Sequence, residues 1–280
     1  MTTKLPKRVY QEKEKRNKAR KKQTTLDLPS IPKISEELMQ DLYDYKLGSQ
    51  CGLFIESKYF NNENVELNDA EKLDAYFQSK AFDKEAEPLY TKGGKLSLPY
   101  KRMDEQSNNF KTFLAKKKWK IEQTYFEFTN PKFIGTSDII ALDKNIKSKV
   151  VYKKRFIIDL RTSGNIETEW EEGKLSDQDY LKAIHHKMLA NYEWGIEDIP
   201  YYFMVFSTKN NWEYKVIKVN VDPSTYSSHY KNLMNAKKYL DENYTLGFKR
   251  QADLHKCNNC SIGNHCINSI DTPEIKELWI

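Results

Sequence analysis

Residues 156–164 read FIIDLRTSG, in which apolar residues lead into an aspartate and an arginine before a glycine ends the stretch. Such a run of aromatic and β-branched residues predicts a buried strand. An ionised carboxylate at the end of a buried strand costs several kcal/mol unless a cation meets it. Asp159 therefore predicts a bound cation at this strand end.

The segments on both sides of this strand predict an antiparallel meander and then further helices and strands. Strand-like runs cover 122–129, 133–142 and 150–160, separated by turn signals at Asn130-Pro131 and in 143–149. Upstream, helical patterns cover 35–47, part of 51–60, 68–82 and 103–117; downstream, a helix at 176–194, strands at 200–209 and 213–219, and a helix at 222–243 are expected. This order predicts an α/β (α+β) protein with a central mixed sheet flanked by helices.

Composition restricts the class of protein and its expected location. The chain has 280 residues, of which 39% are hydrophobic and 13% aromatic, which is enough for a substantial core. No run reaches the roughly 18 apolar residues of a membrane span, and the N-terminus lacks the apolar region of a secretory signal. We therefore expect a protein of the cytoplasm that has no membrane partner.

Positive charge is concentrated at the N-terminus. Ten Lys or Arg lie between Lys4 and Lys22 against two glutamates, although the net charge of the whole chain is only +6. Such a tail, which includes Lys21 and Lys22, can hold nucleic acid phosphates or serve as a solubilising extension. The expected organisation is a basic, disordered tail (1–34), a helical region (35–120), a core (121–250) and a cysteine-rich segment (251–280) that packs on the Cys51 region.

The meander brings two acids to one end of the sheet. Pairing of the second and third strands places Asp138 near Asp159, and period-two alternation puts Arg161 on the same face. Two adjacent carboxylates repel each other unless a divalent cation lies between them, and their oxygen atoms suit Mg or Mn. The alternative is a pair of strand-end acids that cap turns or bind basic side chains.

The segments GTSD (135–138) and IIDLRTSG (157–164) resemble the G-x-x-D and D-x-K motifs of the PD-(D/E)XK nuclease superfamily. The resemblance is nearest to the RecB-like branch with phage exonucleases and the CRISPR-associated iron-sulfur exonucleases, and it implies a restriction-endonuclease-like core. It also implies that Glu56 and the carbonyl of Leu160 complete the metal site, although Glu56 can equally be a solvated helix position. Arg161 replaces the usual lysine: it keeps the positive charge but cannot give up a proton.

The helix at 176–194 departs from the branch, which carries Q-x-x-x-Y there for contact with DNA. If Tyr192 is that tyrosine, Met188 stands at the glutamine position, and His185, His186 or Gln178 can substitute. A histidine beside an apolar stripe is more often structural than functional. The expected DNA contacts are Tyr192, the tail residues Lys21 and Lys22, and His185 as the substitute for the glutamine.

Four cysteines form a second pattern: Cys51, and then Cys257, Cys260 and Cys266 in KCNNCSIGNHC. Four thiolates in an intracellular chain favour a metal over disulfides. By resemblance to the iron-sulfur exonucleases, they imply a structural four-iron, four-sulfur cluster. Zinc remains an alternative, with all four cysteines or with three and His255 or His265.

Together these features predict a metal-dependent DNA nuclease, a phage-type exonuclease that hydrolyses phosphodiester bonds in DNA processing or recombination. Its partners would be single- or double-stranded DNA ends and a recombinase or helicase, in the cytoplasm of a host cell if the origin is a phage. The alternative is a nucleic-acid-binding protein on a nuclease fold that has lost catalysis, with Arg161 in an ion pair with Asp138 or Asp159.

Overall fold

The computed structural model describes residues 31–60, 69–85, 88, 90–92, 94–170, 175–210 and 213–248. By its internal contacts the chain divides into residues 1–32 and residues 33–280, and the fold below belongs to the second unit. The predicted cysteine-rich segment and the tail lysines lie outside the described residues, and the predicted domain boundaries stay a prediction. None of the helices in the described ranges combines the length and apolar character that crossing a membrane requires.

Within the described residues, five strands form one mixed sheet in the order β1-β2-β3-β4-β5. Only the β3–β4 pair is parallel, and the other neighbours are antiparallel. The strands are β1 (Trp119–Thr129), β2 (Ile134–Asp143), β3 (Arg155–Ser163), β4 (Tyr201–Ser207) and β5 (Tyr214–Lys218). The predicted α+β class with a central mixed sheet and an antiparallel meander is confirmed.

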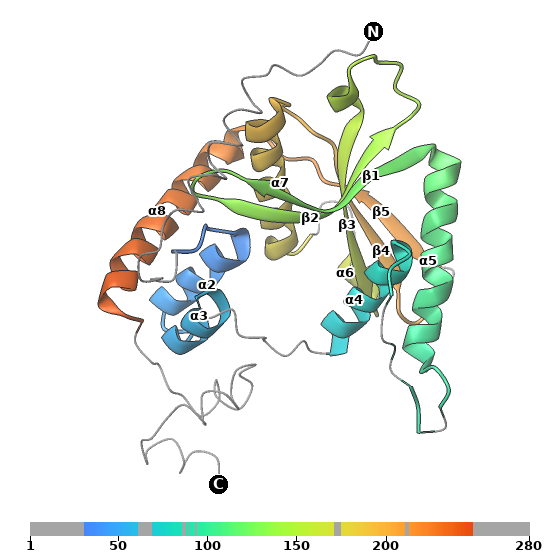
Figure 1. Cartoon of the computed structure of the whole chain (residues 1–280), viewed down its shortest axis with the longest axis horizontal. Coiled ribbons are helices and arrows are strands. Elements are labelled where there is room, and N and C mark those ends of the chain that lie inside the picture. The colour runs from blue at the N-terminus through green and yellow to red at the C-terminus, as the bar shows by residue number, and fades with distance from the viewer. Residues whose placement is uncertain are drawn as a thin grey trace, which may run out of the picture. The chain divides into compact units, whose positions relative to one another are not determined.

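Helices cover both faces of the sheet (Figure 1). On one face lie α4 (Asp69–Ala81) and α5 (Leu98–Lys117), whose apolar side chains pack with those of Ile158 and Phe206. The other face is covered by α2 (Glu36–Lys46), α3 (Gly52–Tyr59), α7 (Asp177–Trp194) and α8 (Ser224–Leu246), with the short α6 (Ile166–Glu169) beside β4. Serine caps begin two of these helices: the Ser35 hydroxyl accepts from Leu38 N, and the Ser176 hydroxyl accepts from Asp179 N.

Two local departures from the expected strands matter for the site. The third strand begins at Arg155 rather than at 150, because residues Val151–Lys154 form the 3₁₀ helix η1, whose side chains are largely exposed. In β1 the register with β2 shifts between Ile121 and Gln123, and Tyr125 has a φ of 51°. A left-handed conformation is rare for a residue with a bulky side chain inside a strand.

Candidate active site

The two predicted aspartates meet where β2 and β3 stop pairing. The regular register ends at the pair Ile139–Ile158; Asp138 directly precedes Ile139, and Asp159 directly follows Ile158. Beyond that point each carboxylate accepts an N–H from the opposite strand. Asp138 N donates to Asp159 Oδ1 over 3.1 Å, and Leu160 N donates to Asp138 Oδ2 over 2.8 Å. The strands therefore fork, and the carboxylates satisfy backbone donors that the ladder has left.

Burial makes this pair electrostatically unequal. Asp159 is fully buried and Asp138 is 7% exposed. Burial, and then the charge of Asp159, raises the pKa of Asp138 to about 6. Burial also acts to raise the pKa of Asp159, but the charges of Lys182, His186 and Arg161 and a hydrogen bond from Tyr201 outweigh it, so that this pKa is lowered. Asp159 is thus the ionised partner, while Asp138 can take up a proton in mildly acidic solution.

Lys182 of α7 supplies the cation that Asp159 needs. Its Nζ lies 3.0 Å from Asp159 Oδ2, and the Tyr201 hydroxyl donates to the same oxygen. Burial acts to lower the pKa of Lys182, but the carboxylates of Asp159, Asp138 and Glu36 together raise it by more, so the ammonium stays charged. Sequence reasoning missed this lysine. The available signal was its spacing from Asp179 and His186, three and four residues away, which puts all three on one stripe of the helix.

Arg161 lies beside the pair, as its place in the strand predicts. Its Nη1 is 4.0 Å from Asp138 Oδ2 and donates to the Leu160 carbonyl over 3.0 Å, and its Nε contacts Asp179 Oδ1 at 3.4 Å. The guanidinium is therefore held by α7 as well as by its own strand. Arg161 and Lys182 bring two cations to two carboxylates.

Behind the aspartates, α7 presses two histidines against β2. His186 Nδ1 is 3.8 Å from Asp159 Oδ2, and His186 Nε2 is 3.7 Å from Glu36 Oε1. His185 lies within hydrogen-bond distance of the Ile134 carbonyl (2.8 Å) and of His229 Nε2 (3.0 Å). A Cβ at Gly135 would come within 2.9 Å of the His186 ring, so glycine is required for this approach. The glycine of the GTSD segment thus has a packing reason.

The structure corrects the prediction that His185 contacts DNA. Its side chain is fully buried, and its two ring nitrogens face Ile134 and His229. Hydrogen bonds offset the cost of burying the imidazole, so His185 packs inside the protein and cannot contact DNA. Tyr192, near the end of the same helix, is 66% exposed and accessible to a ligand.

A polar cavity of about 550 Å³ opens beside the two cations. Carboxylates predominate in its lining, and Arg161 and Lys182 are its cationic members. Glu36, at the start of α2, also lines it; its side chain is largely buried, and its Oε2 has no hydrogen-bond partner in the described part of the chain. Burial acts to raise the pKa of Glu36, but His186, His185 and Lys182 lower it, so the carboxylate is ionised.

The structure does not bring Glu56 to the aspartates. Its Oε1 accepts from Phe248 N over 3.1 Å, which ties α3 to the residues after α8. The acids from α2 and α3 that line the cavity all belong to α2: Glu36, Glu37, Asp41 and Asp44. Among them Glu36, 20 positions before Glu56, has a buried oxygen without a hydrogen-bond partner in the described residues. In the ranges that the structure describes, no three His, Cys, Asp or Glu side chains form a ready metal-binding group. The two aspartates thus form a two-carboxylate site.

Of the four cysteines, Cys51 alone lies within the described residues. It is half-buried and directly precedes α3, and its backbone N donates to Gln50 Oε1. Cys257, Cys260 and Cys266 fall outside the described ranges, as do Lys21 and Lys22. The iron-sulfur cluster and its zinc alternative stay predictions.

Comparison with known proteins gives a likeness in fold. No protein-family model matches the chain, and no curated protein matches it. Three chains of solved structure match. One is a protein from Eubacterium rectale named "Putative exonuclease", which is 14% identical, with a TM-score of 0.54 over 92% of this chain and 98% of the other. At that identity the match shows a shared fold and leaves the chemistry to be argued from the site.

Proposed function

We propose that this protein is a metal-dependent DNA nuclease, an exonuclease of the PD-(D/E)XK superfamily. The observation that carries the proposal is the fork of β2 and β3, where Asp138 and Asp159 meet beside two cations and a polar cavity. Buried like charges at this distance are unfavourable for folding alone, and such pairs are typical of functional sites.

The residues present fit Mg or Mn. Magnesium is commonly held by one or two carboxylates, with water and substrate phosphate as its other ligands, so two aspartates and the Leu160 carbonyl are sufficient. Glu36, rather than Glu56, is our candidate for an additional oxygen donor that approaches when the ion binds, because Glu36 lines the cavity and its buried Oε2 accepts no hydrogen bond within the described residues. The ion would supply an activated water at neutral pH and charge stabilisation at phosphate.

In the proposed site, Lys182 and Arg161 take separate roles in place of the single lysine of the D-x-K motif. Lys182 keeps Asp159 ionised at pH values where an isolated buried acid would be protonated. Arg161 presents a planar fork to the cavity side of the pair and can bind phosphate oxygens in two-point contact. Arg161 stays protonated throughout, so it stabilises charge on phosphate and transfers no proton.

A second candidate function is nucleic acid binding without cleavage. The observation in its favour is that Lys182 and Arg161 already neutralise the carboxylates, as expected of a site that no longer needs a metal. The two candidates differ in how they depend on the acids. An enzyme requires them, whereas a binding protein should hold DNA more tightly when acids that repel phosphate are removed.

The test is cleavage of end-labelled single- and double-stranded DNA with Mg or Mn by the wild type, Asp159→Asn and the exposed-acid control Glu127→Gln. We expect Asp159→Asn to lose about a thousandfold in rate, and the control to lose none. Manganese should also raise the melting temperature of the wild type and of the control but not that of Asp159→Asn. Tighter DNA binding by Asp159→Asn, with no cleavage by any form, would establish the binding protein instead.

A further inference from the structure

The corner where the end of α4 meets β1 carries a tyrosine in an unusual conformation beside the proposed active site. Tyr125 lies between the paired positions Thr124–Ile139 and Phe126–Ser137, which puts it across the strand from Asp138. Its φ of 51° interrupts an otherwise extended strand. The side chain is 38% exposed although the strand lies against the fork.

A left-handed backbone at a residue with a large side chain costs free energy, and such strain tends to persist at functional sites. A second residue with a positive φ, Asp83 at 56°, follows the last turn of α4, and aspartate adopts this conformation more readily than tyrosine. The chain reverses there, and Lys84 N donates to the Ser79 carbonyl over 2.8 Å. The chain reversal at Asp83 places Phe82 and Lys84 on either side of it, and both side chains contact Tyr125.

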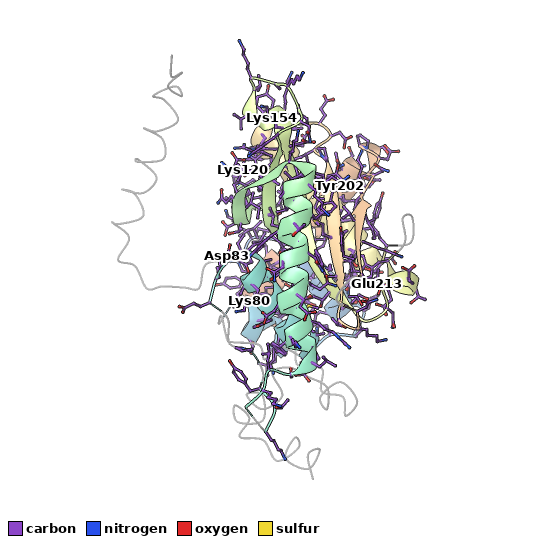
Figure 2. All side chains as sticks on the ribbon, turned by 90° about the vertical axis from the view of Figure 1, so that its right-hand side faces the viewer. Lys80, Asp83, Lys120, Lys154, Tyr202 and Glu213 are labelled. Carbon is purple, nitrogen blue, oxygen red and sulfur yellow. The ribbon has the colours of Figure 1, made fainter. Side chains whose placement is uncertain are left out.

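The side chains at this corner form a compact aromatic and cationic surface. The rings of Phe82 and Tyr125 meet edge to face, with centroids 5.3 Å apart and an interplanar angle of 86°. Lys84 Nζ lies 4.1 Å from the centroid of the Tyr125 ring. We call these three residues the Tyr125 corner. Figure 2 shows Lys80 and Asp83, from the end of α4, on the same side of α5 as Lys120 of β1.

The Tyr125 corner is tied directly to the fork. Gln78, in the last turn of α4, donates from Nε2 to Asp138 Oδ2 over 3.3 Å. Burial, and then the carboxylate of Asp138, raises the pKa of the Tyr125 hydroxyl, so the two groups interact electrostatically. A ligand on the exposed Tyr125 ring would therefore lie next to any phosphodiester held at the two aspartates.

An unpaired nucleotide offers a base that can stack on an aromatic ring and a phosphate that can bind an ammonium, and the Tyr125 corner carries both groups. Bases stack on aromatic side chains with little regard to sequence, and a neighbouring lysine binds the phosphate that follows. A base within a duplex is already stacked on both faces, so this surface suits a single strand or a frayed end. We propose that the Tyr125 corner holds an unpaired nucleotide of the substrate strand, with its base on Tyr125 and a flanking phosphate on Lys84. The proposal rests on the nuclease function proposed above.

The experiment measures binding of a single-stranded oligonucleotide with 2-aminopurine near its end, in EDTA so that the strand is not cut. Tyr125→Asn removes the ring while asparagine tolerates the left-handed backbone. We expect its affinity to fall about tenfold and the quenching of 2-aminopurine to be lost. Tyr125→Phe should keep both. Tyr152→Ala, an exposed tyrosine on η1, is the control and should bind as the wild type does.

Melting temperature separates the proposal from a structural role. If Tyr125 binds nucleotide, Tyr125→Asn should bind weakly while melting at or above the wild-type temperature, because the strain is relieved. Lower melting with unchanged affinity would overturn the proposal and give the ring a structural role. If Tyr125→Asn binds normally and Asp159→Asn has lost cleavage, only the nucleotide site fails. If the wild type neither binds nor cuts DNA, the nuclease function fails with it.

Discussion

The two faces of the sheet bury different kinds of side chain. Against α4 and α5 the buried cluster is apolar, and it includes Phe77, Met103, Phe110 and Phe206. Against α2, α7 and α8 the core is more extensive, and charged and titratable groups are buried beside it. These groups are Asp159, His185, His186, Lys187 and His229.

This difference separates the source of stability from the source of function. Apolar burial contributes about 25 cal/mol per Å², whereas buried charges cost free energy unless each finds a partner. A chain that needed the α7 face only for folding would gain from apolar residues there. Its polar groups are therefore best explained by the site, and the four predictions that follow test this division.

The largest effect on stability is expected on the apolar face. Phe110 is fully buried and packs edge-on against Phe206, so Phe110→Ala leaves a cavity. The variant should lose about 3 to 5 kcal/mol in its free energy of unfolding, measured with urea. Cleavage by the remaining folded protein should stay near the wild-type rate at low temperature. A large loss of rate in fully folded Phe110→Ala would show that the two faces are not separable.

The next effect is on the α7 face, at Lys182. Lys182→Met keeps the stem of the side chain but leaves Asp159 without its nearest cation. We expect a loss of about 3 kcal/mol in stability and about a hundredfold in cleavage rate. Lys187→Met is the matched control, since Lys187 is a buried lysine of the same helix that pairs with Asp198. The assignment of Lys182 fails if both variants lose stability but neither loses rate.

A smaller effect, dependent on pH, is expected from the buried histidines. Burial, and then the charge of His185, lowers the pKa of His229 to about 3, whereas Glu36 acts in the opposite direction. The unfolded chain then binds more protons between pH 6.5 and the folded pKa, so stability is full above pH 6.5 and is lost as the pH falls.

His229→Gln removes this titration. Between pH 7 and pH 5 the wild type should lose about 2 kcal/mol more than the variant in urea unfolding. Asp138 works in the reverse sense, because its raised pKa makes the folded protein bind protons between pH 4 and 6. Equal slopes for the wild type and His229→Gln would mean that His229 is solvated in the folded state.

The residues of the site that strand pairing brings together could be predicted from the sequence, whereas those that helix packing brings there could not. Asp138 and Asp159 are fixed by strand ends and antiparallel pairing, which the alternation of residues reveals. Lys182 and Glu36 reach the same point from α7 and α2, and their arrival depends on how those helices pack. Glu56 was as good a choice as Glu36 from sequence, because both are acids on adjacent N-terminal helices.

The fold was more predictable than the site for the same reason. The helix expected at 176–194 is α7, and the strands expected at 122–129 and 133–142 lie in β1 and β2. These patterns are local and repeat over many residues. The left-handed conformation of Tyr125 affects a single residue inside a strand whose other residues favour extended backbone. The alternation of residues along the strand therefore does not predict it.

The smallest effect is expected at Tyr192, where α7 leaves the buried region. Tyr192 is 66% exposed, so Tyr192→Ala should change stability by less than about 0.5 kcal/mol. If the predicted DNA contact is real, fluorescence anisotropy should show a several-fold loss in affinity for labelled DNA. Tyr43→Ala on α2, also an exposed tyrosine, should show none. Identical affinities for the two variants would confine the DNA-contacting part of α7 to its cavity side, next to Lys182.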